Sequence, residues 1–263
     1  MRMRAKVFIA TIATMAAACA VAYAARTQAD RQALLLADPE SLRTDPRFSL
    51  IVMDRGPAVY ARACASCHGD DGKGSSSRSV PDLTDRKRLY GDGHVAEIER
   101  IVLHGIRAGD SRGWKLSSMP AFARQPSQVE AGIGALSPSD IQDVTAYLLS
   151  IRRHAGATVG AAMEPTMNRA SVERGRSIFA KRGACYDCHG DDARGDSAIG
   201  APDLTDGVWL YGDGSADAIA RSIEVGRAGV CPAFSIRMDA ADARAVAAFV
   251  AGMPARSNQE VRK

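Results

Sequence analysis

Hydrophobic residues recur at helical spacing in short stretches of the chain, and long polar loops separate these stretches. After Ser137 and Pro138, a pair typical of a helix start, Ile141, Val144 and Leu148 fall on one face of the predicted helix. Similar patterns follow residue 239, cover residues 98–102 and 219–223, and precede residues 64 and 185. No stretch alternates convincingly in the manner of a strand, so the sequence predicts an all-α fold.

The first 25 residues form a separate segment. A basic start, Met1 to Lys6, precedes an apolar run from Val7 to Ala25, which ends in a small-x-small pattern at residues 22–24. This layout is typical of a secretory signal peptide, and the run is also about long enough for a membrane anchor. Both interpretations of residues 1–25 place the rest of the chain outside the cytoplasm, in the periplasm, secreted or anchored to the inner membrane.

An internal repeat organises the remainder of the chain. The segment 64–71, Cys-Ala-Ser-Cys-His-Gly-Asp-Asp, recurs as Cys-Tyr-Asp-Cys-His-Gly-Asp-Asp at 185–192. Three further pairs of segments match: 81–85 with 202–206, 89–93 with 210–214, and 119–122 with 231–234. The repeat predicts two tandem domains, 52–154 and 170–256, joined by a linker rich in Ala, Gly and Pro.

Each repeat contains a Cys-x-x-Cys-His string, which is the attachment motif of haem c. The residues are Cys64, Cys67 and His68 in the first repeat and Cys185, Cys188 and His189 in the second. The two thiols form thioethers with the haem vinyl groups, and the histidine binds iron. One such string could also be a zinc site or a dithiol redox pair. Two strings in matching contexts behind an export leader predict two haems c.

The sixth iron ligand is expected downstream of each motif. Met119, which precedes Pro120, is the expected ligand of the first iron opposite His68, with His104 as a rival. In the second repeat Cys231 occupies the matching position, so it is the expected ligand opposite His189. Met238, or an iron without a protein ligand on that side, remains an alternative there.

The charge of the chain says little about partners. The formal net charge is +4, from 34 basic and 30 acidic residues, and part of the excess lies in the leader. This balance does not indicate a nucleic-acid partner. Redox proteins, an electron donor and an acceptor, are the expected partners of a dihaem cytochrome.

Several strings together resemble the dihaem c-type subunit of cbb3-type (C-family) haem–copper oxidases. They lie at residues 104–107, 119–122, 202–206, 209–212 and 226–230. The resemblance implies class I cytochrome c domains, an N-terminal anchor helix, and electron transfer towards a membrane-bound, oxygen-reducing subunit. It also implies methionine where Cys231 stands. The alternative expectation is an enzyme that oxidises a sulfur compound or reduces peroxide at a cysteine-ligated haem.

Overall fold

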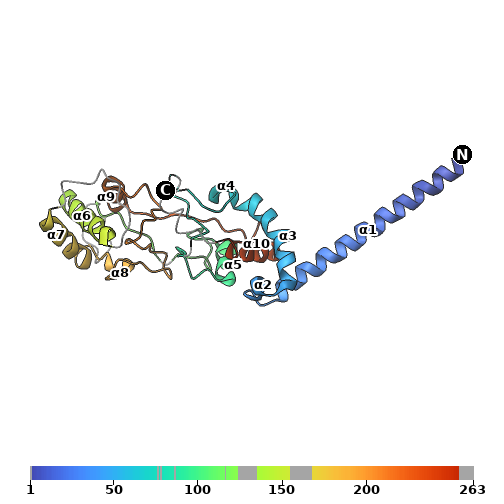
Figure 1. The fold of residues 1–263 in the computed structure, drawn as a ribbon, viewed down its shortest axis with the longest axis horizontal. Helices are drawn as coiled ribbons and strands as arrows, with labels where there is room; N and C mark the ends of the chain where they lie inside the picture. Colours follow the sequence, from blue (N-terminus) through green and yellow to red (C-terminus); the bar gives the residue numbers. More distant parts are fainter. Residues whose placement is uncertain are drawn as a thin grey trace.

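The computed structural model describes residues 2–75, 77, 79–85, 87–115, 117–123, 135–154 and 168–254. Helices and loops make up these residues, with isolated bridges but no named strand, so the all-α prediction is confirmed (Figure 1). In order, the helices are α1 (Arg2–Leu36), α2 (Ser41–Thr44), α3 (Pro46–Ala63), α4 (Ala65–His68), α5 (Val95–His104), α6 (Pro138–His154), α7 (Arg169–Ala180), α8 (Tyr186–His189), α9 (Ala216–Val225) and α10 (Ala240–Ala251).

Polar residues at the helix starts explain where several of these helices begin. The Asp45 carboxylate accepts the Arg47 backbone N–H ahead of α3, and Asp239 accepts the Ala241 N–H ahead of α10. Asn168 caps α7 and Ser215 caps α9 in the same way. Such caps satisfy N–H groups that the first helical turn leaves without a partner.

The helices form two units, and each unit contains a helix from the other repeat. In the proximal unit, α10 of the second repeat packs on α3 and α5 of the first. In the distal unit, α6 of the first repeat packs on α7 and α9 of the second. Figure 1 shows the proximal unit beside α1 and the distal unit at the far end. Two tandem repeats therefore form two intertwined units, and the boundaries 52–154 and 170–256 stay a prediction.

In each unit, a helix of one repeat crosses a helix of the other at a glycine, where the backbones are too close for a larger residue. A Cβ at Gly56 of α3 would lie 2.6 Å from the Cβ of Phe249 on α10. A Cβ at Gly175 of α7 would lie 1.9 Å from the backbone oxygen of Asp143 on α6. An aromatic pair packs edge to face beside each crossing: Tyr60 with Phe249 at 5.8 Å and Tyr147 with Phe179 at 5.4 Å between ring centroids. The same contact therefore recurs twice, each time between helices of different repeats.

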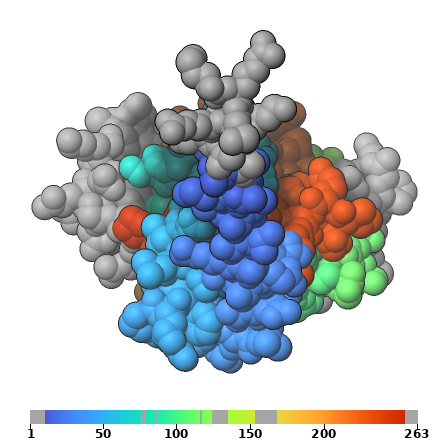
Figure 2. All heavy atoms as spheres, turned by 90° about the vertical axis from the view of Figure 1, so that its right-hand side faces the viewer, coloured from blue at the N-terminus to red at the C-terminus, as the bar shows by residue number. Residues whose placement is uncertain are grey.

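Helix α1 projects from the proximal unit as a long rod whose last turns are fixed to the body (Figure 1). Leu34 is fully buried, and Arg31 forms an ion pair with Asp239 at 2.6 Å. Arg244 of α10 donates to the backbone oxygens of Leu34 and of its neighbours. Figure 2 views this end, where blue residues of the early chain lie beside orange and red residues of the late chain.

Within the described residues, no helix combines the length and the hydropathy that crossing a membrane requires. Cleavage of the leader and its retention as an anchor both stay predictions.

Candidate haem-binding sites

The two Cys-x-x-Cys-His strings fold as single helical turns, α4 and α8. The backbone N–H of His68 donates to the Cys64 oxygen at 2.9 Å, and that of His189 donates to the Cys185 oxygen at 2.9 Å. Each i to i+4 bond brings a histidine under the first cysteine of its own motif. Both cysteines and the histidine of a string can therefore face one planar group.

Both histidines are oriented by a proline carbonyl. His68 Nδ1 lies 3.1 Å from the Pro81 oxygen, and His189 Nδ1 lies 3.0 Å from the Pro202 oxygen. A carbonyl can only accept, so Nδ1 carries the proton and the Nε2 lone pair is left for iron. Burial lowers the pKa of both imidazoles, which favours this neutral form. Sequence reasoning missed the role of these prolines, although both lie in the repeated Pro-Asp-Leu-Thr-Asp string.

A cavity in the distal unit fits a haem. Cys185, Cys188 and His189 line one part of it, and apolar side chains from both repeats line most of the remainder. The indole Nε1 of Trp209 is buried at this cavity without a hydrogen-bond partner in the described structure. A buried donor of this kind indicates a missing acceptor, and a haem carries two carboxylates that could accept its hydrogen. The lining therefore offers two thiols, an imidazole, an apolar slot and a polar donor.

Met119 lines the distal cavity together with His189, whereas the sequence led us to expect it opposite His68; its role as an iron ligand stays a prediction. Its backbone exchanges two hydrogen bonds with Arg227, at 2.9 and 3.0 Å, and the Phe122 N–H donates to the Ile223 oxygen at 3.0 Å. Arg227 follows α9, a helix of the second repeat. The Met-Pro-Ala-Phe loop is thus paired with the second repeat, and this pairing brings Met119 to the cavity of His189.

The loop that contains Cys231 crosses in the opposite direction. Cys231 and Ile106 exchange backbone hydrogen bonds at 2.9 and 3.1 Å, and the Phe234 N–H donates to the Val102 oxygen at 3.0 Å. The Cys231 sulfur therefore belongs to the proximal unit, where Cys64 and Cys67 influence its pKa. The sequence led us to expect Cys231 opposite His189, but its backbone is paired with the first repeat; its role as an iron ligand stays a prediction.

The two other ligand candidates have clear positions. Met238 packs against the apolar cluster of the proximal unit, as Cys64 does, so it too lies with the first motif. His104 Nδ1 lies 2.9 Å from an Asp110 carboxylate oxygen. The pKa of Asp110 is lowered to about 2, mainly by the Arg112 backbone N–H and then by His104. His104 thus has a carboxylate partner in the loop that follows α5.

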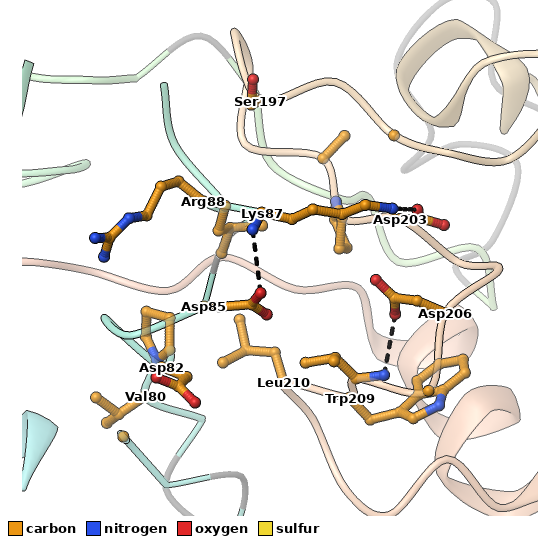
Figure 3. Close-up of a pocket in the computed structure, with 18 of the residues that line it drawn as sticks. Val80, Asp82, Asp85, Lys87, Arg88, Ser197, Asp203, Asp206, Trp209 and Leu210 are labelled. Carbon is orange, nitrogen blue, oxygen red and sulfur yellow. Dashed lines mark hydrogen bonds and ion pairs between the residues drawn. The ribbon is translucent and has the colours of Figure 1, made fainter. Parts of the chain in front are cut away.

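A second cavity, of about 960 Å³, lies between the two Pro-Asp-Leu-Thr-Asp loops (Figure 3). Lys87 of the first repeat reaches across it to an ion pair with Asp203 of the second. Asp206 accepts the Val208 backbone N–H at 3.0 Å, and burial raises the pKa of Asp206 to about 6. Trp209 lines this charged cavity as well as the distal haem cavity, so the two cavities share a wall.

Comparisons with known proteins agree with this architecture. The model of the family described as cytochrome c matches residues 53–152, and that described as cytochrome c oxidase, cbb3-type, subunit III matches 170–250. The FixP subunit of cbb3-type cytochrome c oxidase from Bradyrhizobium is 34% identical over 83% of this chain and 67% of its own length. The chain belongs to this family of cbb3 oxidase subunits.

Two further members have similar identity. The CcoP subunits of Rhodobacter capsulatus and Cereibacter sphaeroides are each 33% identical, over 87% and 88% of this chain and 71% of their own lengths. This chain therefore spans about two thirds of the length of these relatives. One cytochrome family model covers each Cys-x-x-Cys-His string, which confirms the prediction of two haems c. Membership of the cbb3 oxidase subunits confirms the prediction of a chain on the periplasmic side of the membrane.

Proposed function

We propose that this chain transfers electrons through its two haems towards a terminal oxidase, as a subunit of a cbb3-type complex. The observation that carries the proposal is the pair of histidine sites held in one intertwined body. When bound, the haem irons exchange single electrons, and the chain needs no substrate site for that. The relatives that share most of this chain are themselves oxidase subunits, which supports the acceptor.

The haem ligands in this proposal are exchanged between the repeats. His189 and Met119 would hold the distal iron, because both line one cavity. His68 and Cys231 would hold the proximal iron, because the Cys231 loop is hydrogen-bonded to the segment that follows α5. Met238, in the same apolar cluster as Cys64, is the remaining candidate for the proximal iron.

The two ligand sets would separate the haems in potential. A thioether such as that of Met119 raises a haem potential relative to a second nitrogen ligand. A cysteine thiolate stabilises the ferric state because it is anionic, and so lowers the potential. Burial raises the pKa of the Cys231 thiol to about 11, so it needs a nearby cation to lose its proton at neutral pH. A ferric iron opposite His68 would be that cation, and the proximal haem would be the low-potential one.

An enzyme that uses sulfur compounds or peroxide is the less favoured alternative. Its sequence basis was a cysteine-ligated haem at the second motif, whereas the Cys231 backbone is hydrogen-bonded to Ile106 of the first repeat. The relatives also favour an oxidase subunit rather than such an enzyme.

Isolation of the tagged full-length chain from membranes of its host tests the proposal. The chain should co-purify with an oxygen-reducing oxidase, and both of its haems, reduced in advance, should be reoxidised when oxygen is admitted. A chain whose haems stay reduced under oxygen in that preparation, but are oxidised by peroxide, would contradict the oxidase role and favour the enzyme.

A further inference from the structure

The distal cavity contains two arginines in a lining that is otherwise mostly apolar. Arg107 belongs to the first repeat and Arg227 to the second, and both are half-buried. Their neighbours in the lining include Phe122, Leu148 and Phe179. A guanidinium keeps its charge at any physiological pH, and a partly buried charge is costly unless an anion compensates it.

Arg107 is held firmly, but only by neutral groups. Its Nε donates to the Gly229 oxygen at 2.6 Å, its Nη1 to the Ser117 oxygen at 2.8 Å, and its Nη2 to the Tyr90 hydroxyl at 2.7 Å. A guanidinium has five N–H groups, so these bonds leave others for a further acceptor. Its backbone has a φ of +52°, a left-handed conformation that is strained for a residue with a Cβ. Strain of this kind is typical of ligand-binding segments.

Arg227 repeats the arrangement on the other side. Its guanidinium stacks on the Tyr211 ring at 4.5 Å from the centroid, and its Nε and Nη2 lie 3.1 and 3.0 Å from the Ser222 hydroxyl. In the part of the chain that the structure describes, neither Arg107 nor Arg227 forms an ion pair with a carboxylate. Asp187 and Asp203 also line this cavity, but within the described residues neither forms an ion pair with these arginines, and Asp203 is paired with Lys87.

We infer that Arg107 and Arg227 provide the counter-charge for the carboxylates of the distal haem. The thioether cysteines and the apolar slot match the ring, and the arginines, with Trp209 Nε1, match its two acids. Arg107 would then be a positioning residue through which the first repeat adjusts a haem that the second repeat binds covalently. The inference rests on the proposed function, since it takes His189 and Met119 as the ligands of this haem.

A redox titration of the full dihaem protein tests this role. A cation beside a haem stabilises the reduced form, because reduction removes one positive charge from the iron. Arg107→Gln and Arg227→Gln should each shift the ratio of reduced to oxidised distal haem at least tenfold towards oxidised at a fixed potential. That shift equals about 59 mV for a one-electron couple. Arg107→Lys should recover part of it, since lysine restores the charge without the planar fork.

Arg100→Gln is the matched control, because Arg100 stacks on Trp114 and does not line the distal cavity. An unchanged distal potential in both glutamine variants, or a shift confined to the proximal haem, would overturn the inference. If Arg107→Gln does not accumulate with two haems, the pair Arg107→Lys and Arg227→Gln decides by the same measurement. If the unmodified protein shows no methionine-ligated haem, the ligands given in the proposed function are wrong. That failure can be told apart from a failure of the inference about the arginines.

Discussion

The proximal and distal units share a frame but differ at the positions that would face their haems. Both are closed by a glycine crossing, and both hold a histidine through a proline carbonyl. The loop that reaches the distal unit carries Met119, whereas the matching loop in the proximal unit carries Cys231. The two repeats share a scaffold, while the exchanged loops bring a methionine to one site and a cysteine to the other.

The two repeats also differ at the position occupied by Trp209 in the second repeat. Trp209 lines the distal cavity and stacks under Arg152, whose guanidinium lies 4.7 Å from the ring centroid. The first repeat has Arg88 at the matching position, which donates to the Leu83 carbonyl. A neutral indole and a cation thus occupy equivalent places. The units therefore differ in the polar residues beside each site as well as in the side chains proposed as sixth ligands.

The largest expected effect comes from making the two loops alike. Cys231→Met should raise the potential of the proximal haem by on the order of 0.1–0.4 V, because axial ligands together span roughly 0.8 V. The distal potential should stay constant in a spectroelectrochemical titration that follows both haems. Cys19→Ser is the control, since Cys19 lies in the exposed part of α1. A shift of the distal potential instead would show that the ligands are not exchanged.

The second prediction replaces the proposed methionine ligand of the distal haem by a nitrogen ligand. Met119→His should lower the distal potential by roughly 0.1–0.3 V and abolish the absorption band of methionine-bound ferric haem, while the proximal signals remain. Met238→Leu is the matched methionine control and should leave the distal spectrum intact, because Met238 packs in the proximal unit. If Met238→Leu alters the proximal signals, Met238 rather than Cys231 is the ligand there.

Much of this architecture could be predicted from the sequence, because local chemistry determines it. The Cys-x-x-Cys-His strings, the capping residues and the helical periodicity each act over a few residues, and the helices predicted from them are present. The exchange of loops could not be predicted in this way. The offset between Met119 and Cys231 is the same whichever unit each loop enters, so the repeat aligns the two residues without placing them in space.

The sequence does contain one sign of the helix crossings. Gly56 lies four residues before Tyr60, and Gly175 lies four residues before Phe179. This spacing marks where two helices cross but does not say which helix packs against each. Only the 14 residues of the predicted linker, 155–168, separate α6 from α7 in the sequence, and these two helices pack together. Because α6 packs on α7, it does not pack on α3 of its own repeat, and α10 packs on α3 instead. Arg107 was recognised only as part of a motif, since its contacts come from both repeats.

The two glycine crossings can be compared through the free energy of unfolding that an alanine substitution costs at each. Gly175→Ala should destabilise the protein by about 3 kcal/mol, since the new Cβ meets a backbone oxygen that cannot move aside. Gly56→Ala should cost less, about 1–2 kcal/mol, because it meets the Phe249 side chain. Denaturant unfolding of the dihaem protein measures both. Gly252→Ala, whose Cβ would have its nearest contact at 3.4 Å, should stay within about 0.5 kcal/mol of the unmodified protein. Equal losses at both crossings would contradict the steric explanation.

The smallest effect concerns the charged cavity between the units. Burial raises the pKa of Asp206 from 3.8 to about 6, so the folded state binds this proton more tightly than the unfolded chain. Ionisation of Asp206 therefore lowers the free energy of unfolding. This loss is absent below pH 3.8, grows as the pH rises to about 6, and is constant above that. Asp206→Asn should therefore stabilise the protein at pH 7.5, by at most about 1 kcal/mol given its partial exposure, and flatten the stability profile between pH 4 and 6.

Asp85 is the matched control for this variant, because it holds the equivalent place in the first repeat and accepts the Lys87 backbone N–H at 3.1 Å (Figure 3). Asp85→Asn should leave most of the pH dependence due to Asp206 in place, because the Asp85 charge is the smallest of the influences on the Asp206 pKa, far behind burial. Unfolding free energies of the three proteins across pH 4 to 7.5 decide between these outcomes. If Asp206→Asn is no more stable than the unmodified protein at pH 7.5, the carboxylate is compensated in the folded state. Lys87, already paired with Asp203, would then be the cation that serves both acids.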